Sequence, residues 1–204
     1  MSDKTGSVPS NGHRIRGRSS ESFIDALEVL SRLNLKGDEV FMDAGCGDGH
    51  VALLAHELLD DDAVIYALDS FEPSIEDLEN HVKAKGITNI IPIQGDIAGD
   101  IPLTDDMVDV CLLINVFHHF VAQENTDEAI SELKRIIKPG GRVAVMDYKK
   151  MDTGYGPPLK YKRSPEELQE MFTRHGFKMV QLDTEVGEDL EGGVKSHYLV
   201  VFQR

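Results

Sequence analysis

The chain has 204 residues, and 41% of them are hydrophobic, which is enough for one compact core and excludes wholesale disorder. Asp and Glu number 36 against 21 Lys and Arg, and the resulting net charge of −15 argues against non-specific binding to nucleic acid or to an anionic membrane. No apolar run approaches the roughly 18 residues of a membrane span, so we expect no membrane contact and a cytoplasmic location. Two cysteines, Cys46 and Cys111, are too few for a disulfide framework, and we expect both to be reduced and buried.

Residues 1–19 are polar and carry a net charge of +3 from four basic residues and Asp3. We predict a flexible basic arm here, although the stretch 13–18 has the charge to fold back on the acidic remainder of the chain. Residues 20–204 then form the one folded domain that the length allows.

From about residue 20 the chain alternates between helix and strand patterns. Apolar residues at three- and four-residue spacing predict helices, and short apolar runs predict strands. We expect helices over 23–33, 50–58, 73–82, 129–137 and 164–175, and strands over 40–42, 64–68, 90–93, 108–114, 142–146, 177–182 and 196–202.

This alternation predicts a doubly wound α/β fold, with parallel strands joined by helices on both faces of the sheet. Pro92 places the third strand at an edge, and the last two strands have no helix between them, so they pair antiparallel. The expectation is a seven-stranded, mostly parallel sheet whose last strand is antiparallel. Ligands of such sheets bind outside the carboxyl ends of the strands, which directs attention to residues 43–49, 69–71, 95–97, 115–119 and those from 147 onward.

The first of these loops holds a glycine pattern between a strand and a helix, Asp43-Ala44-Gly45-Cys46-Gly47-Asp48-Gly49. Glycines at such a junction let a ligand approach the main chain closely. The dinucleotide fingerprint G-x-G-x-x-G would need glycine at position 50, which is His50. Asp43 would also repel a pyrophosphate, whereas it suits a cationic ligand. A nicotinamide-dependent oxidoreductase therefore stays only as an alternative.

Two further acids follow the next strands. Asp69 lies 24 residues after Gly45, close to the offset at which an acid accepts hydrogen bonds from ribose hydroxyls. Asp96, followed by Ile97, is placed to meet an adenine edge, although an Asp after a strand is also common in turns.

Taken in order, these motifs resemble the class I S-adenosylmethionine-dependent methyltransferases, and the resemblance covers about residues 20–204. The stretch 109–119 is similar to the family's fourth motif, and 133–143, with Lys138-Pro139-Gly140-Gly141, resembles the segment before its fifth strand. The subgroup resembled is the small one near the ubiquinone/menaquinone-biosynthesis and arsenite methyltransferases. The chain departs from the arsenite enzymes because it lacks the cysteines that hold the metalloid.

The resemblance implies a Rossmann-like methyltransferase fold, S-adenosylmethionine as cofactor, and a role in its binding for a set of strand-end residues. Gly45, Gly47 and Asn115 would lie beside the methionine portion, and Asp69 would hold the ribose. The full set is Asp43, Gly45, Cys46, Gly47, Asp69, Ser70, Phe71, Asp96, Ile97 and Asn115.

The sequence indicates the residues that would act on the methyl acceptor less clearly than those that would bind the cofactor. His118, His119 and Asp147 follow the fourth and fifth strands and are the candidate proton acceptors, with a purely structural role as the alternative. No third ligand accompanies the two histidines, so we expect no metal site. The loop 148–163 carries a net charge of +4 and three tyrosines, which favours an anionic or aromatic acceptor if the loop covers the site. We expect a small-molecule acceptor, with a non-catalytic S-adenosylmethionine-binding regulatory protein as the alternative.

Overall fold

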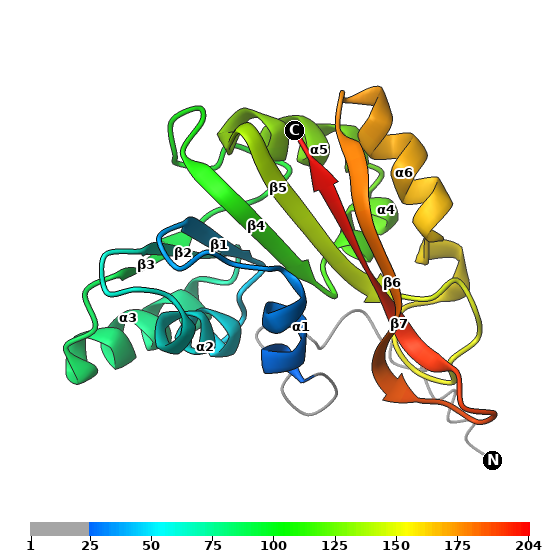
Figure 1. Cartoon of the computed structure of the whole chain (residues 1–204), viewed down its shortest axis with the longest axis horizontal. Coiled ribbons are helices and arrows are strands. Elements are labelled where there is room, and N and C mark those ends of the chain that lie inside the picture. The colour runs from blue at the N-terminus through cyan, green and yellow to red at the C-terminus, as the bar shows by residue number, and fades with distance from the viewer. Residues whose placement is uncertain (1–24) are drawn as a thin grey trace, which may run out of the picture.

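The computed structural model describes residues 25–204, and their core is a seven-stranded sheet with helices on both faces (Figure 1). The strand order across the sheet is β3-β2-β1-β4-β5-β7-β6. The basic arm predicted over residues 1–19, like Phe23, lies outside the described residues.

The seven strands of the described residues lie where the apolar patterns predict them. The strands are β1 (Val40–Ala44), β2 (Val64–Asp69), β3 (Ile90–Gln94), β4 (Val108–Ile114), β5 (Ile137–Tyr148), β6 (Lys178–Asp189) and β7 (Lys195–Gln203). The helices are α1 (Ala26–Arg32), α2 (His50–Leu58), α3 (Glu72–Lys85), α4 (Phe117–Gln123), α5 (Thr126–Ile136), the short 3₁₀ helix η2 (Leu159–Tyr161) and α6 (Pro165–Arg174). Of these helices, α1, α2, α3, α5 and α6 lie where the patterns predict them, whereas α4, which carries His118 and His119, and η2 were not predicted.

The direction of the strands confirms the predicted fold class. The strands β1 to β5 pair in parallel, whereas β7 is inserted between β5 and β6 and is antiparallel to both. The strand with Pro92, β3, is at the edge, as expected from the N–H that proline lacks. All carboxyl ends of the five parallel strands therefore meet at one end of the sheet, where the candidate residues follow them.

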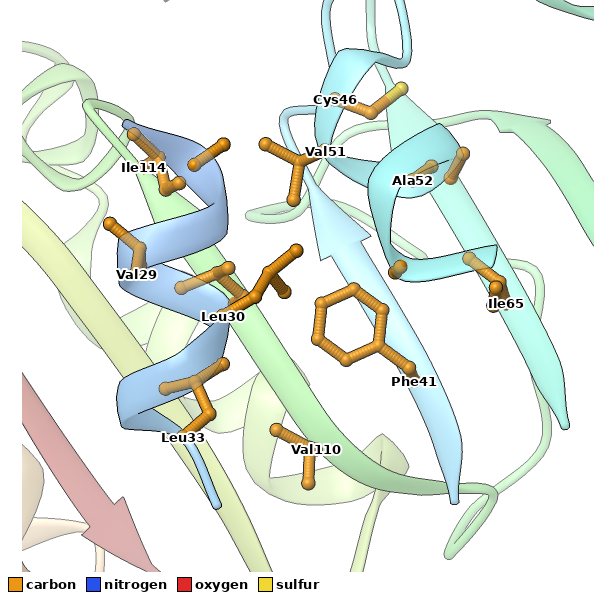
Figure 2. Close-up of a cluster of buried hydrophobic side chains, with 14 of the residues drawn as sticks. Val29, Leu30, Leu33, Phe41, Cys46, Val51, Ala52, Ile65, Val110 and Ile114 are labelled. Carbon is orange, nitrogen blue, oxygen red and sulfur yellow. The ribbon is translucent and has the colours of Figure 1, made fainter. Parts of the chain in front are cut away.

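Two hydrophobic cores, one on each face, hold the helices to the sheet. On one face α1, α2 and α3 pack against the sheet, and Figure 2 shows Leu30 of α1 directed toward the Phe41 ring of β1. On the other face α4, α5 and α6 pack around Phe117, Phe172 and Phe202, and the Phe172 and Phe202 rings stack with centroids 4.1 Å apart. The central strand β4 is buried on both faces of the sheet, because its side chains alternate between the two cores.

Three local expectations differ from the structure. Leu27 and Leu58 lie on the apolar stripes of the helices predicted over 23–33 and 50–58, but they are 48% and 50% exposed. The buried faces of the two helices are narrower than these stripes: α1 buries Ala26, Val29 and Leu30, and α2 buries Val51, Ala52 and Ala55. The helix before β5 ends at Ile136 and β5 begins at Ile137, but residues 138–141 form a bulge without register partners, in which Gly140 has a φ of +82°.

The last two strands are longer than their apolar runs suggest. The strand β6 reaches Asp189, past the predicted end at residue 182, and only residues 190–194 make the turn to β7. The paired ends of β6 and β7 extend past the rest of the sheet (Figure 1). This extension places β7 residues beside the ends of β4 and β5.

Candidate functional site

The glycine loop after β1 has a backbone that only glycine adopts easily. Gly45, Gly47 and Gly49 all have positive φ angles, of 83°, 54° and 81°. The amides of Gly45 and Cys46 both donate to the carbonyl of Leu68 in β2, at 2.7 and 2.9 Å. A Cβ atom at Gly45 would lie 2.4 Å from Cγ2 of Val116, so the loop also packs against the chain leaving β4. The loop is a cradle of main-chain atoms that a side chain would fill.

Asp69 joins this loop to the one after β2. Its Oδ2 accepts from the Gly47 amide at 2.9 Å and its Oδ1 accepts from the Phe71 amide at 2.8 Å. An ionised carboxylate has about four lone-pair sites, so each oxygen keeps capacity for a further hydrogen bond. The half-buried Asp69 is thus held rigidly while it remains able to accept a diol, and Ser70 beside it is exposed.

Asp43 lies under the glycine loop rather than in it. Its side chain is buried, and Oδ2 accepts from the amide of Ala52 in α2 at 3.1 Å. Burial raises the pKa of Asp43 to about 7, against the hydrogen bond from Ala52, and the negative charges of Asp69 and Asp48 add to the rise. Neighbouring Cys46 is also buried, and burial raises the pKa of its thiol, so the thiol stays protonated. A cationic ligand above the loop would relieve this repulsion among acids.

The loop after β3 brings the third expected pair to the same edge of the sheet. Asp96 is exposed, and its Oδ1 accepts from the Ala98 amide at 3.0 Å in a local turn. The Ile97 side chain is buried in the core on the α4–α6 face. A ligand at this edge would therefore meet the Asp96 carboxylate, whereas Ile97 supports the loop from below.

His118 and Asp147 form a hydrogen-bonded pair across the ends of β4 and β5. Nδ1 of His118 lies 3.0 Å from Oδ1 of Asp147, and Oδ2 accepts from the His118 amide, also at 3.0 Å. Burial of Asp147 opposes its charge, but the attraction of His118 and the hydrogen bonds from His118 and from the Tyr148 amide outweigh it and lower the pKa of Asp147. An ionised Asp147 fixes the proton of His118 on Nδ1, which leaves Nε2 as the acceptor nitrogen.

Aromatic rings surround this pair. The His119 ring lies 4.3 Å from the His118 ring between centroids, and the Tyr148 ring lies 6.0 Å from His118 on another side. Tyr155 from the following loop contacts Tyr148 edge-on at 6.1 Å. All three predicted acceptor-side residues, His118, His119 and Asp147, therefore lie close together.

The sequence pattern did not single out His197, which lies on β7 with no exposed surface. Its Nε2 is 3.1 Å from Oδ1 of Asn115, and its ring packs at 4.1 Å on Tyr148. Asn115, with a positive φ of 57°, ends β4 and donates its amide to the carbonyl of Met146. A histidine in the apolar stretch 196–202 was the one available signal, because a buried polar ring needs partners.

Part of the positive charge of the loop 148–163 is used within the protein, and Lys162 is directed inward. Nζ of Lys162, a residue 2% exposed, donates to the carbonyl of Met151 and to Oγ1 of Thr153. Burial lowers the pKa of Lys162, and its third donor direction is met by the Tyr148 ring, 5.3 Å from Nζ. Lys150 pairs with Glu167 of α6. The remaining partnered cations behave alike: Lys160 lies over the Tyr161 ring and Arg163 donates to loop carbonyls.

Two of the hollows on the surface of the described residues can be compared with the candidate site. One, of about 350 Å³, is lined by loop residues that include Tyr155, Leu159 and Lys162, and the other, of about 540 Å³, is lined only by residues of α6. Neither is built from the strand ends, so we place the candidate site by the converging side chains described above. Within residues 25–204 no group of three or more His, Cys, Asp or Glu side chains is arranged to hold a metal ion. The same residues contain no helix that is long and apolar enough to cross a membrane.

Comparison with known proteins places this geometry in a family. A family profile described as a methyltransferase domain matches residues 35–193. Demethylmenaquinone methyltransferase of Geobacillus kaustophilus (strain HTA426) is 27% identical over 124 residues, which cover 59% of this chain and 50% of the relative. The mouse (Mus musculus) tRNA (carboxymethyluridine(34)-5-O)-methyltransferase ALKBH8 is 30% identical over 99 residues, covering 44% of this chain and 14% of the relative. The chain thus spans half or less of the length of these curated relatives.

Solved structures share the fold over nearly the whole chain. The crystal structure of an S-adenosylmethionine-dependent methyltransferase from Aquifex aeolicus superimposes with a TM-score of 0.74 at 23% sequence identity, covering 88% of this chain and 89% of that one. This structural similarity shows the fold alone, and one fold can act on many different acceptors.

Proposed function

The chain belongs to the S-adenosylmethionine-dependent methyltransferases, and we propose that it transfers a methyl group to a small aromatic acceptor that carries an acidic O–H or C–H group. The observation that carries the proposal is the His118–Asp147 pair enclosed by aromatic rings at the ends of β4 and β5.

The donor side fits the cofactor of this family. S-adenosylmethionine supplies an electrophilic methyl group on a cationic sulfonium. The Gly45–Gly49 cradle leaves main-chain space for the methionyl portion, and Asp69 has free acceptor capacity for the ribose hydroxyls. Asp96 would meet the adenine edge, with Phe71 and Ser70 beside it. A sulfonium above the loop would favour the ionised form of Asp43, whose pKa burial raises to about 7.

On the acceptor side, His118 is the proposed general base. With Nδ1 donating to Asp147, Nε2 has a lone pair available to take a proton from the acceptor, and the imidazolium that forms is stabilised by the Asp147 carboxylate. His119 and Tyr148 flank His118 and would hold a planar acceptor against it by ring stacking. Holding the acceptor in this orientation removes a large part of the free-energy barrier to an in-line displacement.

The chemistry of the site favours an aromatic over an anionic acceptor. Of the five cations of this loop, Lys150, Lys162 and Arg163 are bonded to groups of the protein, which leaves Lys149 and the exposed Lys160 for an external anion. Aromatic rings, in contrast, lie on several sides of the His118–Asp147 pair. The mouse relative acts on tRNA, but a net charge of −15 works against phosphate binding. The Geobacillus relative, whose name denotes an aromatic quinone acceptor, agrees with the proposal.

The test has two steps. Calorimetric titration with S-adenosylhomocysteine first establishes the cofactor site, with NADH as the control for the oxidoreductase alternative. Transfer of labelled methyl groups from S-adenosylmethionine is then measured to a panel of phenols and naphthoquinols, to bulk tRNA and to unfolded protein. Label in the aromatic panel alone is the expected result. Label in tRNA or protein would overturn the acceptor class, and cofactor binding without transfer to any acceptor pool would favour the non-catalytic alternative.

A further inference from the structure

A chain of hydrogen bonds runs from β6 through β7 to the end of β4. The Glu188 amide donates to Oγ of Ser196 at 2.9 Å, and Oγ of Ser196 lies 2.7 Å from Nδ1 of His197. Nε2 of His197 then lies 3.1 Å from Oδ1 of Asn115, a residue 82 positions away in the sequence. None of these contacts belongs to the His118–Asp147 pair or to the glycine loop.

The direction of each hydrogen bond in the chain follows from its ends. Ser196 Oγ accepts from the Glu188 amide and also hydrogen-bonds the Tyr155 side chain. Asn115 Oδ1 can only accept, so a neutral His197 donates to it from Nε2 and accepts the Ser196 proton at Nδ1. A neutral imidazole that accepts at Nδ1 carries its proton at Nε2, which donates to Asn115 Oδ1. Burial lowers the pKa of His197 to about 4, although the charges of Asp147 and Glu188 oppose the shift, so the ring is neutral at pH 7.

Asn115 is thereby held in a single orientation. Its backbone is fixed by the φ of 57° and by the bond to Met146, and Oδ1 is taken by His197. The side-chain NH₂ group of Asn115 (Nδ2) donates to no described residue. Its two N–H bonds suit carboxylate oxygens and are repelled by an ammonium group.

Gly187 shows how closely the residues around His197 pack. Its φ is +83°, and a Cβ atom there would lie 2.5 Å from Nδ1 of His197 and 2.7 Å from Oγ of Ser196. On the other side the His197 ring packs against Tyr148 at 4.1 Å. Backbone, hydroxyl and aromatic ring therefore confine the imidazole to the orientation in which it reaches Asn115.

We propose that His197 is a positioning residue that locks the Asn115 carboxamide, so that the Asn115 NH₂ group binds the carboxylate of the methionyl portion of the donor. The inference rests on the proposed function, since it assigns a role within the same cofactor site. His197 touches neither donor nor acceptor and acts only through Asn115.

The experiment compares two ligands that differ in the methionyl portion. S-adenosylhomocysteine has this portion and 5′-methylthioadenosine lacks it, so only the first senses Asn115. His197→Phe keeps a ring against Tyr148 but removes both nitrogens. We expect this variant to bind S-adenosylhomocysteine about tenfold more weakly, in line with one lost charge-assisted hydrogen bond, and to bind 5′-methylthioadenosine as the wild type does.

Two further variants test the route through Asn115. His197→Gln retains a donor near the Nε2 position and is expected to recover most of the affinity for S-adenosylhomocysteine. Asn115→Gly tolerates the positive φ and removes the carboxamide, so it should reproduce the ligand pattern of His197→Phe. The double variant should then be no weaker than either single variant, because both remove one interaction.

Different experimental results would overturn the inference about His197 and the proposed function. Equal weakening of both ligands in His197→Phe, or weakening of neither, overturns the inference. Wild-type protein that binds neither ligand overturns the proposed function instead. Should His197→Phe fail to fold, Ser196→Ala carries the test: it frees the His197 proton to move between the ring nitrogens, and a weaker affinity for S-adenosylhomocysteine alone is the expected result.

Discussion

Two regions of the candidate site are built from different kinds of contact. In the loops after β1 and β2, carboxylates bond main-chain amides: Asp69 accepts from amides 22 and 2 residues away and Asp43 accepts from an amide 9 residues away. Near the ends of β4 and β5, side chains pair with side chains: His118 meets Asp147 at a separation of 29 residues, and Asn115, which we assign to the donor side, meets His197 at a separation of 82.

This difference explains why the carboxylates that bond main-chain amides can be predicted from the sequence, whereas the side-chain pairs cannot. A carboxylate that bonds nearby main-chain amides needs only a short, recognisable motif, since the backbone supplies the donors. Two side chains that meet across neighbouring strands need the strand order and the register, which a single sequence does not display. The following variants test this contrast, beginning with the acceptor side, where the expected effect is largest.

His118→Gln should lower kcat by about 10²–10⁴-fold with the acceptor found in the panel, because glutamine cannot take the proton. Asp147→Asn should lower kcat as well, since it no longer fixes the proton of His118 on Nδ1. Steady-state rates against pH make the measurement, and the affinity for S-adenosylhomocysteine is the control. Unchanged kcat in both variants would exclude the base role and leave the pair a structural one.

Asp69→Ala should weaken S-adenosylhomocysteine binding about tenfold or more, because it removes charge-assisted bonds to the ribose. Asp48→Ala is the matched control: it removes the same charge from the adjoining loop, where Asp48 bonds only the His50 amide among the contacts described. Calorimetry measures both. If Asp69→Ala retains its affinity, or if Asp48→Ala loses as much, Asp69 does not hold the ribose.

Gly45→Ala should destabilise the fold by about 1–3 kcal/mol, since it adds strain at positive φ and a clash with Val116. Gly86→Ala separates the two causes, because Gly86 has a φ of 70° but no atom within 4 Å of the Cβ position. The free energy of unfolding from urea titration is the measurement. Equal losses in the two variants would mean that the close approach of the Gly45 loop to the β4 end contributes nothing.

Asp43→Asn should change the pH dependence of stability. The folded pKa of Asp43, about 7, is above its ordinary value near 3.8, so its contribution is fully present below pH 3.8 and is lost as the pH rises through 7. The wild type should therefore lose about 1 kcal/mol relative to Asp43→Asn between pH 6 and 7. Unfolding midpoints across this range measure it, and parallel curves for the two proteins would contradict the raised pKa.

Local patterns predicted most of the elements, but the boundaries moved where tertiary pairing opposed them. The alternation of apolar runs predicted all seven strands, and Pro92 predicted the edge. Residues 138–141 have the composition of a turn and lie within the bounds of β5 as a bulge without register partners, so the strand begins at Ile137 rather than at residue 142. Leu58 belonged to an apolar stripe and became exposed, because only the narrower face with Ala52 fits against the sheet.

The sequence by itself predicted the part of the proposed donor side that lies in the loops after β1, β2 and β3, since glycines and carboxylates at strand ends act on the main chain next to them. It also named His118, His119 and Asp147 as separate candidates. Only the tertiary structure decided that His118 pairs with Asp147 and that His197 reaches Asn115, since both contacts depend on which strands are neighbours. The insertion of β7 beside β5 is a long-range choice, and it brings a buried histidine to a site that is 82 residues away in the chain.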